Sequence, residues 1–299
     1  MQYRAQGVSL LPRRPLRSLL TGRHASRLRG RGLNFEEIRA YLPGDDIRTI
    51  DWRVTGRTQR PAVRVYTEER DRPLFVVVDQ RISMFFGSRK NMNSVTAAEI
   101  AAAACWRALA NGDRVGGVVF NDSESVEVKP LRSRSTVMRL LGEVVRMNRA
   151  LNAQTGPKAN AGKLNEVLDK LVRAVKHDSL VVVLSTFFGD SEETVRSLSR
   201  LAAHNDLVIG LIYDELQMHP PEGGRLLVTD GDLQIEVSRA GERERHKLSE
   251  FFIDRMQKTR QRLAGLGVPV MMISNAQDAL EQVRRQIGGI AAAGRGGQL

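Results

Sequence analysis

Residues 74–88 read LFVVVDQRISMFFGS, in which five consecutive apolar residues are followed at once by the carboxylate of Asp79. An unbroken apolar run of this length is typical of a strand in a parallel sheet, because helices cover both faces of such a sheet. Open α/β sheets bind ligands at the carboxyl ends of their strands, so Asp79 and Ser83 are candidate binding residues. The alternative is that Asp79 only caps the helix that follows, since Asp and Ser are common at strand-to-helix turns.

Strand and helix patterns alternate along most of the 299 residues, which favours one principal α/β domain. Strand-like runs cover residues 115–120, 180–184, 207–213 and 268–274, and helical patterns cover residues 96–109, 135–147, 164–175, 191–203 and 276–287. The helix opened by Ser135 carries one predicted core face, made of Val137, Leu140, Leu141, Val144 and Val145. Residues 226–229 and 233–237 flank Asp230-Gly231 and predict a β-hairpin. The sequence therefore predicts a doubly wound, mainly parallel sheet, with this hairpin apart from it.

The positive charge of the chain is concentrated at its start. Residues 1–35 contribute +8 of the net charge of +12, through eight arginines and no acid. A basic arm with arginines 13–31 suits an anionic membrane surface or nucleic acid. An arm that packs on its own domain or on an acidic partner is the alternative, because no stacking aromatic residue lies among arginines 13–31.

Composition excludes several other classes of protein. The single cysteine, Cys105, rules out an internal disulfide and a thiolate metal cluster, which favours a reducing compartment. The five histidines form no zinc motif, residues 156–163 depart from a phosphate-binding loop, and no nucleophile elbow occurs. Without a spanning segment or a signal peptide, we expect a cytoplasmic protein that is not an enzyme.

Residues 34–52 read NFEEIRAYLPGDDIRTIDW and form the most distinctive block of the sequence. Phe35, Ile38, Tyr41 and Leu42 recur at helical spacing, which predicts a helical turn ended by Pro43-Gly44. Residues 62–67 predict a strand. The charges at Asp45, Asp46, Arg48, Asp51, Arg53 and Arg57 predict an ion-pair network and hence a fixed surface.

This block, followed by EER at 68–70, VVVDQRISM at 76–84 and GDRVG at 112–116, closely resembles the Domain of Unknown Function 58 family over residues 22–287. The resemblance implies a von Willebrand factor A-like fold and an association with MoxR-type AAA+ ATPases. It divides the chain into a basic arm (1–31), a signature segment packed on the main domain (32–73), the von Willebrand factor A-like domain (74–288) and a mobile tail (289–299).

The resemblance also implies a metal-ion-dependent adhesion site at the strand ends. Its ligand positions fall on Asp79, Ser83, Ser135, Thr186 and Asp190. Arg81 stands where the family pattern has a hydroxyl, and Thr186 stands about where it has a second carboxylate. A hard divalent cation requires oxygen ligands with net negative charge, so we expect a degenerate site with weak Mg²⁺ binding or none. Arg81 is expected to pair with Asp79 in place of a metal.

Two functions from different classes follow. The first is a non-enzymatic adaptor that binds a MoxR-type AAA+ ATPase and its client proteins, with other von Willebrand factor A proteins as further partners. The expected contact residues are Tyr41, Gly44, Asp45, Asp46, Arg48, Asp51, Trp52, Arg57 and Arg81. The second is a protein whose basic arm docks on an anionic membrane surface or on nucleic acid, with no specific nucleic-acid sequence and at most peripheral membrane contact.

Overall fold

The computed structural model describes residues 33–43, 45–68, 72–152, 159–218, 227–229, 234–236 and 242–293. The chain divides into two compact units: Gly22–Asp71 is the smaller, and Met1–Thr21 with Arg72–Leu299 form the larger. The basic arm and the last six residues lie outside the described residues.

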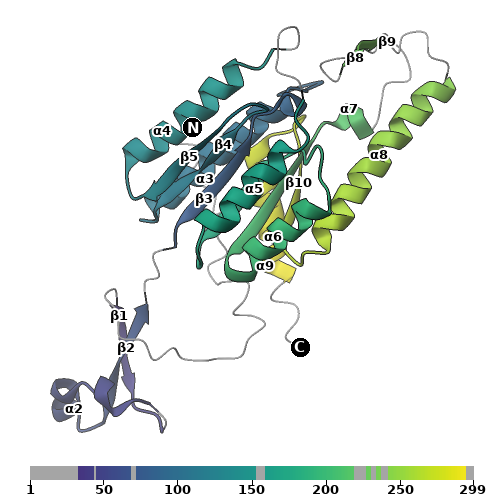
Figure 1. The fold of residues 1–299 in the computed structure, drawn as a ribbon. Coiled ribbons are helices and arrows are strands. Elements are labelled where there is room, and N and C mark those ends of the chain that lie inside the picture. The colour runs from purple at the N-terminus through teal and green to yellow at the C-terminus, as the bar shows by residue number, and fades with distance from the viewer. Residues whose placement is uncertain are drawn as a thin grey trace. The chain divides into compact units, whose positions relative to one another are not determined.

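The larger unit is built on a six-stranded sheet (Figure 1). Its strands in spatial order are β10 (Val270–Ser274), β7 (Asp206–Tyr213), β6 (Leu180–Ser185), β3 (Leu74–Asp79), β4 (Val115–Phe120) and β5 (Ser125–Leu131). Neighbouring strands run parallel except β5, which pairs antiparallel with β4 at one edge. All six residues of β3, β4 and β6 are buried, as strands covered on both faces must be.

Helices cover both faces of this sheet. One core cluster joins the sheet to α3 (Asn93–Ala110), α4 (Arg134–Arg149) and α9 (Ala279–Ala293). A second cluster, on the other face, joins it to α5 (Lys163–Ala174), α6 (Glu192–His204) and α8 (Glu242–Ala264). Cys105 of α3 is completely buried, and this burial raises the pKa of its thiol to about 12.

The chain order of these strands places a ligand site. We number the six strands by their order in the chain and list them across the sheet from β5 to β10. They then read third, second, first, fourth, fifth and sixth, which is the doubly wound order. The order reverses between β3 and β6, so the loops that follow these two strands run in opposite directions from the carboxyl ends of the strands. The predicted von Willebrand factor A-like arrangement, a mainly parallel doubly wound sheet, is confirmed.

Most predicted elements are present, with differences at their ends. The hairpin strands β8 (Leu227–Thr229) and β9 (Gln234–Glu236) form a separate antiparallel sheet, as expected. Helix α3 begins at Asn93 and not at Thr96, whose hydroxyl is buried without a hydrogen-bond partner. The sequence analysis missed β5, α8 and the four-residue α7 (Glu215–Met218). No helix that the structure describes is long and apolar enough to cross a bilayer.

The smaller unit contains an antiparallel strand pair, β1 (Leu33–Ala40) and β2 (Ala62–Glu68). Between them lie the 3-10 helix η2 (Ile47–Thr49) and helix α2 (Trp52–Thr58). The strand predicted at 62–67 is confirmed, whereas the helical turn predicted from Phe35 to Leu42 is wrong.

A β-bulge explains the misleading spacing. The register shifts between Phe35 and Glu37, so that Phe35 pairs with Tyr66 and Ile38 pairs with Arg64. Positions three apart on β1 thus face positions two apart on β2. An apolar spacing of three therefore arises in a strand and imitates a helix.

We expect Gly117→Ala to destabilise the larger unit by about 3 kcal/mol, because a β-carbon there would lie 2.1 Å from the backbone oxygen of Val76. Backbone on the neighbouring strand cannot move aside as a flexible side chain would. The matched control is Gly142→Ala in α4, where a β-carbon meets nothing within 4 Å. That change should stabilise the protein by up to about 1 kcal/mol through helix propensity. Urea denaturation of both variants measures the difference, and equal effects would contradict the close packing of β4 on β3.

Candidate functional site at the strand ends

Buried polar residues gather where the parallel strands end. Asp79 ends β3, Asp122 follows β4 by two residues, Ser185 ends β6 and Asp214 directly follows β7. All four are buried. Because parallel strands end at one edge of a sheet, this set surrounds the point where the strand order reverses.

The centre of the site is a salt bridge between Asp79 and Arg81, both of which are completely buried. The guanidinium contacts both carboxylate oxygens, with Nη2 at 2.8 Å from Oδ2 and Nε at 3.1 Å from Oδ1. The backbone N–H of Arg81 donates to Oδ1 at 3.0 Å, and the Ser185 hydroxyl donates to Oδ2 at 2.6 Å. The Arg81 side chain also lies over the Phe120 ring, 5.6 Å from its centre. The predicted pairing of Arg81 with Asp79 is therefore present, and the hydrogen bond from Ser185 links it to the end of β6.

A second carboxylate holds the neighbouring loops around this pair. Asp122 accepts the backbone N–H of Ile82 at 2.6 Å and that of Asn160 at 2.8 Å. The carbonyl of Asn160 in turn accepts from Nη1 of Arg81 at 3.1 Å. Burial raises the pKa of Asp122, while its two backbone hydrogen bonds and the nearby Arg81 act in the opposite direction. Three loops are thus connected through charged, buried groups.

Two hydroxyls beside the salt bridge have no partner. The Oγ of Ser83 and the Oγ1 of Thr186 are both buried, and neither makes a hydrogen bond. The backbone N–H of Thr186 meets only the sulfur of Met84, at 3.3 Å. Buried hydroxyls are normally hydrogen-bonded, so these two are unused oxygen atoms, at positions that the resemblance assigns to metal ligands.

Asp190 has other partners. It accepts from Thr259 at 2.9 Å and from Arg262 at 2.7 Å, and so fixes the loop before α6 to α8. Arg255 of α8 stacks on Phe188 at 4.7 Å from the ring centre. Burial lowers the pKa of Arg255. The negative charge of Asp190 acts to raise this pKa, and the positive charge of Arg81 lowers it further. The structure therefore uses Asp190 to anchor a helix that the sequence analysis had missed.

Ser135 is not part of the site. It lies in the first turn of α4, where its hydroxyl contacts that of Ser133 at 2.6 Å. Strand β5 runs antiparallel to β4, so it ends beside the start of β4. The chain therefore enters α4 at the end of the sheet where the parallel strands begin, away from the carboxyl end of β3. Its placement among the metal ligands is corrected for this reason, and Ser133 rather than Ser135 caps the helix.

The residues at the strand ends do not fit a divalent cation. Both oxygens of Asp79 already accept hydrogen bonds, and a guanidinium lies where a cation would have to approach. Among the described residues, no three carboxylate, imidazole or thiol side chains come together. A divalent cation needs anionic oxygen ligands, which Thr186 and the paired Asp79 do not supply.

Sequence reasoning missed Asp122, Asp214 and Asn160. Both aspartates follow apolar strands, so the argument that selected Asp79 was able to find them as well. Asp214 accepts the backbone N–H and the hydroxyl of Ser88, at 2.7 and 2.6 Å, and thereby fixes the loop after β3. Asn160 gives no signal in the sequence, since only its tertiary contacts distinguish it.

The signature block, residues 34–57, forms a second candidate surface, on the smaller unit. Its acids support the backbone: Asp45 makes a bidentate pair with Arg39 at 2.8 Å, and Asp46 and Asp51 cap η2 and α2. The Arg39 guanidinium and the Leu42 N–H hold the pKa of Asp45 below its usual range. Helix caps and the ion pair of Arg39 with Asp45 thus support the backbone of the predicted surface.

Apolar and basic side chains of this block point outward. Leu42, Ile47 and Trp52 are 59%, 63% and 69% exposed, and Arg48 and Arg57 are exposed beside them in the sequence. Asp51 and Arg81 are buried, so their place among the partner-contacting residues is corrected: both support the structure. Tyr41 is half-buried, and Gly44 lies outside the described residues.

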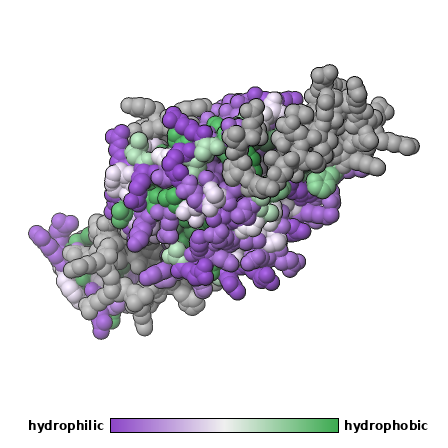
Figure 2. Space-filling view, turned by 45° about the horizontal axis from the view of Figure 1, so that its top comes forward, coloured by the Kyte–Doolittle hydropathy of each residue, from purple (hydrophilic) through white to green (hydrophobic). Residues whose placement is uncertain are grey.

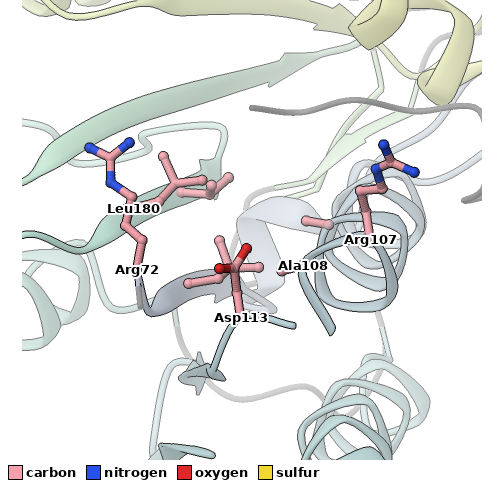
Figure 3. Close-up of a pocket in the computed structure, with 8 residues that line it drawn as sticks. Arg72, Arg107, Ala108, Asp113 and Leu180 are labelled. Atoms are coloured by element: carbon pink, nitrogen blue, oxygen red, sulfur yellow. The ribbon is translucent and has the colours of Figure 1, made fainter. Parts of the chain in front are cut away.

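One further face of the molecule and one cavity were also candidates for a binding site. Figure 2 shows described residues that are mostly hydrophilic on the face turned forward, with hydrophobic residues in small separate areas. A cavity lies near the starts of β3 and β6, at the end of the sheet away from the strand-end site. Arg72, Arg107 and Asp113 line it together with apolar residues that include Ala108 and Leu180 (Figure 3). Its volume is about 20 Å³, enough for about one water molecule. This cavity is too small for an organic substrate.

Comparison with protein families matches residues 37–260 to the model described as "Protein of unknown function DUF58". The chain belongs to the DUF58 family. The match includes most of the signature block and every strand of the sheet except β10. Uncharacterized proteins of Mycobacterium tuberculosis and Mycobacterium bovis are 28% identical to this DUF58 protein over 225 residues, which cover 75% of this chain and 69% of theirs.

Solved structures similar to this DUF58 protein include the conserved hypothetical protein BatB from Bacteroides thetaiotaomicron. It has a TM-score of 0.44 and 12% identity, with 74% of this chain and 99% of that chain covered. A von Willebrand factor type A protein from Catenulispora acidiphila has a TM-score of 0.34 and 13% identity, with coverages of 76% and 45%. The strand order of the sheet carries the assignment of the fold.

Proposed function

We propose that this DUF58 protein is a non-enzymatic protein-interaction module that works with a MoxR-type AAA+ ATPase in the assembly or maturation of client proteins. The observation that carries the proposal is the exposed group Leu42, Ile47 and Trp52 on a backbone fixed by Asp45, Asp46 and Asp51. Exposed tryptophan and arginine on a preformed surface are the side chains that dominate binding energy at protein interfaces.

The strand-end site supports the same proposal from another direction. Adhesion sites of this fold family bind partners through a metal, whereas here the salt bridge of Arg81 and Asp79 closes that position. A protein partner is thus bound without a metal. The choice of a MoxR-type ATPase rests on the resemblance of the signature block.

We expect the double variant Ile47→Ser, Trp52→Ser to bind the MoxR-type ATPase of the same organism at least about thirtyfold more weakly than the unchanged protein. Such a loss corresponds to the removal of an apolar anchor from the centre of an interface. Biolayer interferometry with the immobilised ATPase measures it, and a chelator should leave the affinity unchanged.

The matched control is Phe251→Ser, because Phe251 of α8 is 60% exposed but belongs to the larger unit. Its affinity should equal that of the unchanged protein. The proposal fails if the unchanged protein does not bind the ATPase, or if Phe251→Ser weakens binding as much as the double variant does.

A further inference from the structure

Helix α4 has a buried apolar line and, on its outer side, a second line that contains two large apolar residues. Val137, Leu140, Val144 and Met147 face the sheet and belong to its core cluster. A second line, called here the outer seam, consists of Ser135, Met138, Gly142, Val145 and Arg149. All five residues of the outer seam are exposed, and Met138 and Val145 expose 54% and 48% of their surface.

The spacing of the outer seam is that of a helix-packing surface. Its residues follow one another at intervals of three, four, three and four, which is the heptad pattern of helices that pack along their length. The sequence analysis placed Val145 on the same predicted core face as Val137 and Val144. The structure places Val145 outside, in line with Met138, and Figure 1 shows α4 as an outer helix beside β4 and β5.

Small residues alternate with the apolar ones in this seam. A β-carbon at Gly142 would meet nothing within 4 Å, so the space above this glycine is open. An exposed glycine inside a helix costs stability relative to alanine. Between Met138 and Val145 it leaves a notch, and a small residue at such a position allows a second helix to approach closely, since the distance between helix axes depends on the side chains at the contact.

The flanks of the outer seam are positively charged. Arg139 lies beside the seam and Arg149 ends it; both are exposed, and neither makes an ion pair with any residue that the structure describes. Two acids nearby, Glu124 and Glu143, both bind Arg146, each at 2.8 Å. Arg146 holds the pKa of Glu124 below its usual range.

From the seam and its charges, we propose that α4 docks an amphipathic helix of a partner protein, with apolar residues along one line and carboxylates at their sides. A second copy of this chain would set arginine against arginine across the seam. A bilayer surface would require a wider apolar face than the two large apolar side chains of this seam. The inference goes beyond the proposed function, because it adds a second surface on the larger unit.

The probe is a synthetic helical peptide of four heptads, with leucine at the seam positions and glutamate at the flanking positions, and a twin peptide with lysine for glutamate. The full-length protein should bind the glutamate peptide at least about fivefold more tightly than the lysine peptide, because exposed ion pairs each contribute modestly. The variant Arg139→Glu, Arg149→Glu should reverse this preference. Met138→Gln should weaken both peptides without changing the preference.

The matched control is Arg196→Glu, Arg200→Glu on α6, which makes the same change in net charge on the opposite face of the sheet. This control should keep the preference for the glutamate peptide. Equal effects of the two charge variants, or no preference in the unchanged protein, would overturn the inference.

Two further measurements separate the other occupants. A dimer that sedimentation detects in the unchanged protein and not in Met138→Gln would assign the seam to a second copy. Cosedimentation with vesicles of 30% phosphatidylserine in phosphatidylcholine, abolished by the α4 variant and kept by the α6 variant, would assign it to a membrane. Either result would overturn the inference, and neither concerns the Trp52 surface.

Discussion

Asp79→Ala is expected to lower the free energy of unfolding of the larger unit by about 3–5 kcal/mol, because it strands a buried guanidinium. Arg81 is completely buried, and without Asp79 its remaining hydrogen-bond acceptor is the carbonyl of Asn160. Ser185 loses the acceptor of its hydroxyl at the same time. Urea denaturation, followed by circular dichroism, measures the change.

The double variant Asp79→Ala, Arg81→Met is the matched control. It removes both charges and keeps most of the volume of the arginine side chain, so it should recover most of the lost stability. The coupling between the two positions should then exceed about 2 kcal/mol in a double-mutant cycle. If Asp79→Ala costs under about 1 kcal/mol, or if the double variant is less stable than the single one, the salt bridge does not organise the strand ends.

The double variant Arg81→Ser, Thr186→Asp is expected to create a metal site. It removes the guanidinium from Asp79 and adds a carboxylate where Thr186 now has an unpartnered hydroxyl. The hydroxyls of Ser83 and Ser185 then become available as neutral oxygen ligands. We expect Mn²⁺ or Mg²⁺ to bind this variant with a Kd of about 0.1–1 mM, and the unchanged protein at least about tenfold more weakly.

Isothermal titration calorimetry measures both affinities. The matched control, Arg81→Ser, Thr186→Asn, has the same shape without the second carboxylate and should not bind. Micromolar binding by the unchanged protein would contradict the expectation and would mean that Asp190 or another acid completes the shell. Equal binding by the aspartate and asparagine variants would show that charge at position 186 does not matter.

The strand-end site of this DUF58 protein differs from a metal-dependent adhesion site in the origin of its cation. At the strand ends, the cation is part of the chain, since Arg81 binds Asp79 from two residues away. A fixed internal cation does not exchange with solvent, so under the proposed function partner binding would not depend on the metal supply. In these proposals, contact with partners falls to the signature block and to the outer seam of α4.

The sequence alone determined the parts of the molecule that depend on local pattern. The valine-rich runs at β3 and β6 predicted buried parallel strands, because only such strands are apolar at every position. The turn residues at 230–231 predicted the hairpin strands β8 and β9 in the same way. The pairing of Arg81 with Asp79 was also predictable, since the two residues are close in the chain and opposite in charge.

Tertiary structure decided everything that depends on which segments meet. Strand β1 was mistaken for a helix because its bulge against β2 gives an apolar spacing of three. Ser135 was placed among metal ligands although the antiparallel course of β5 carries it to the opposite sheet edge. Val145 was assigned to the core, yet it lies on the exposed line of α4. Asn160 acquires its role only because its loop folds against Asp122 and Arg81, and such long-range contacts leave no local pattern in a sequence.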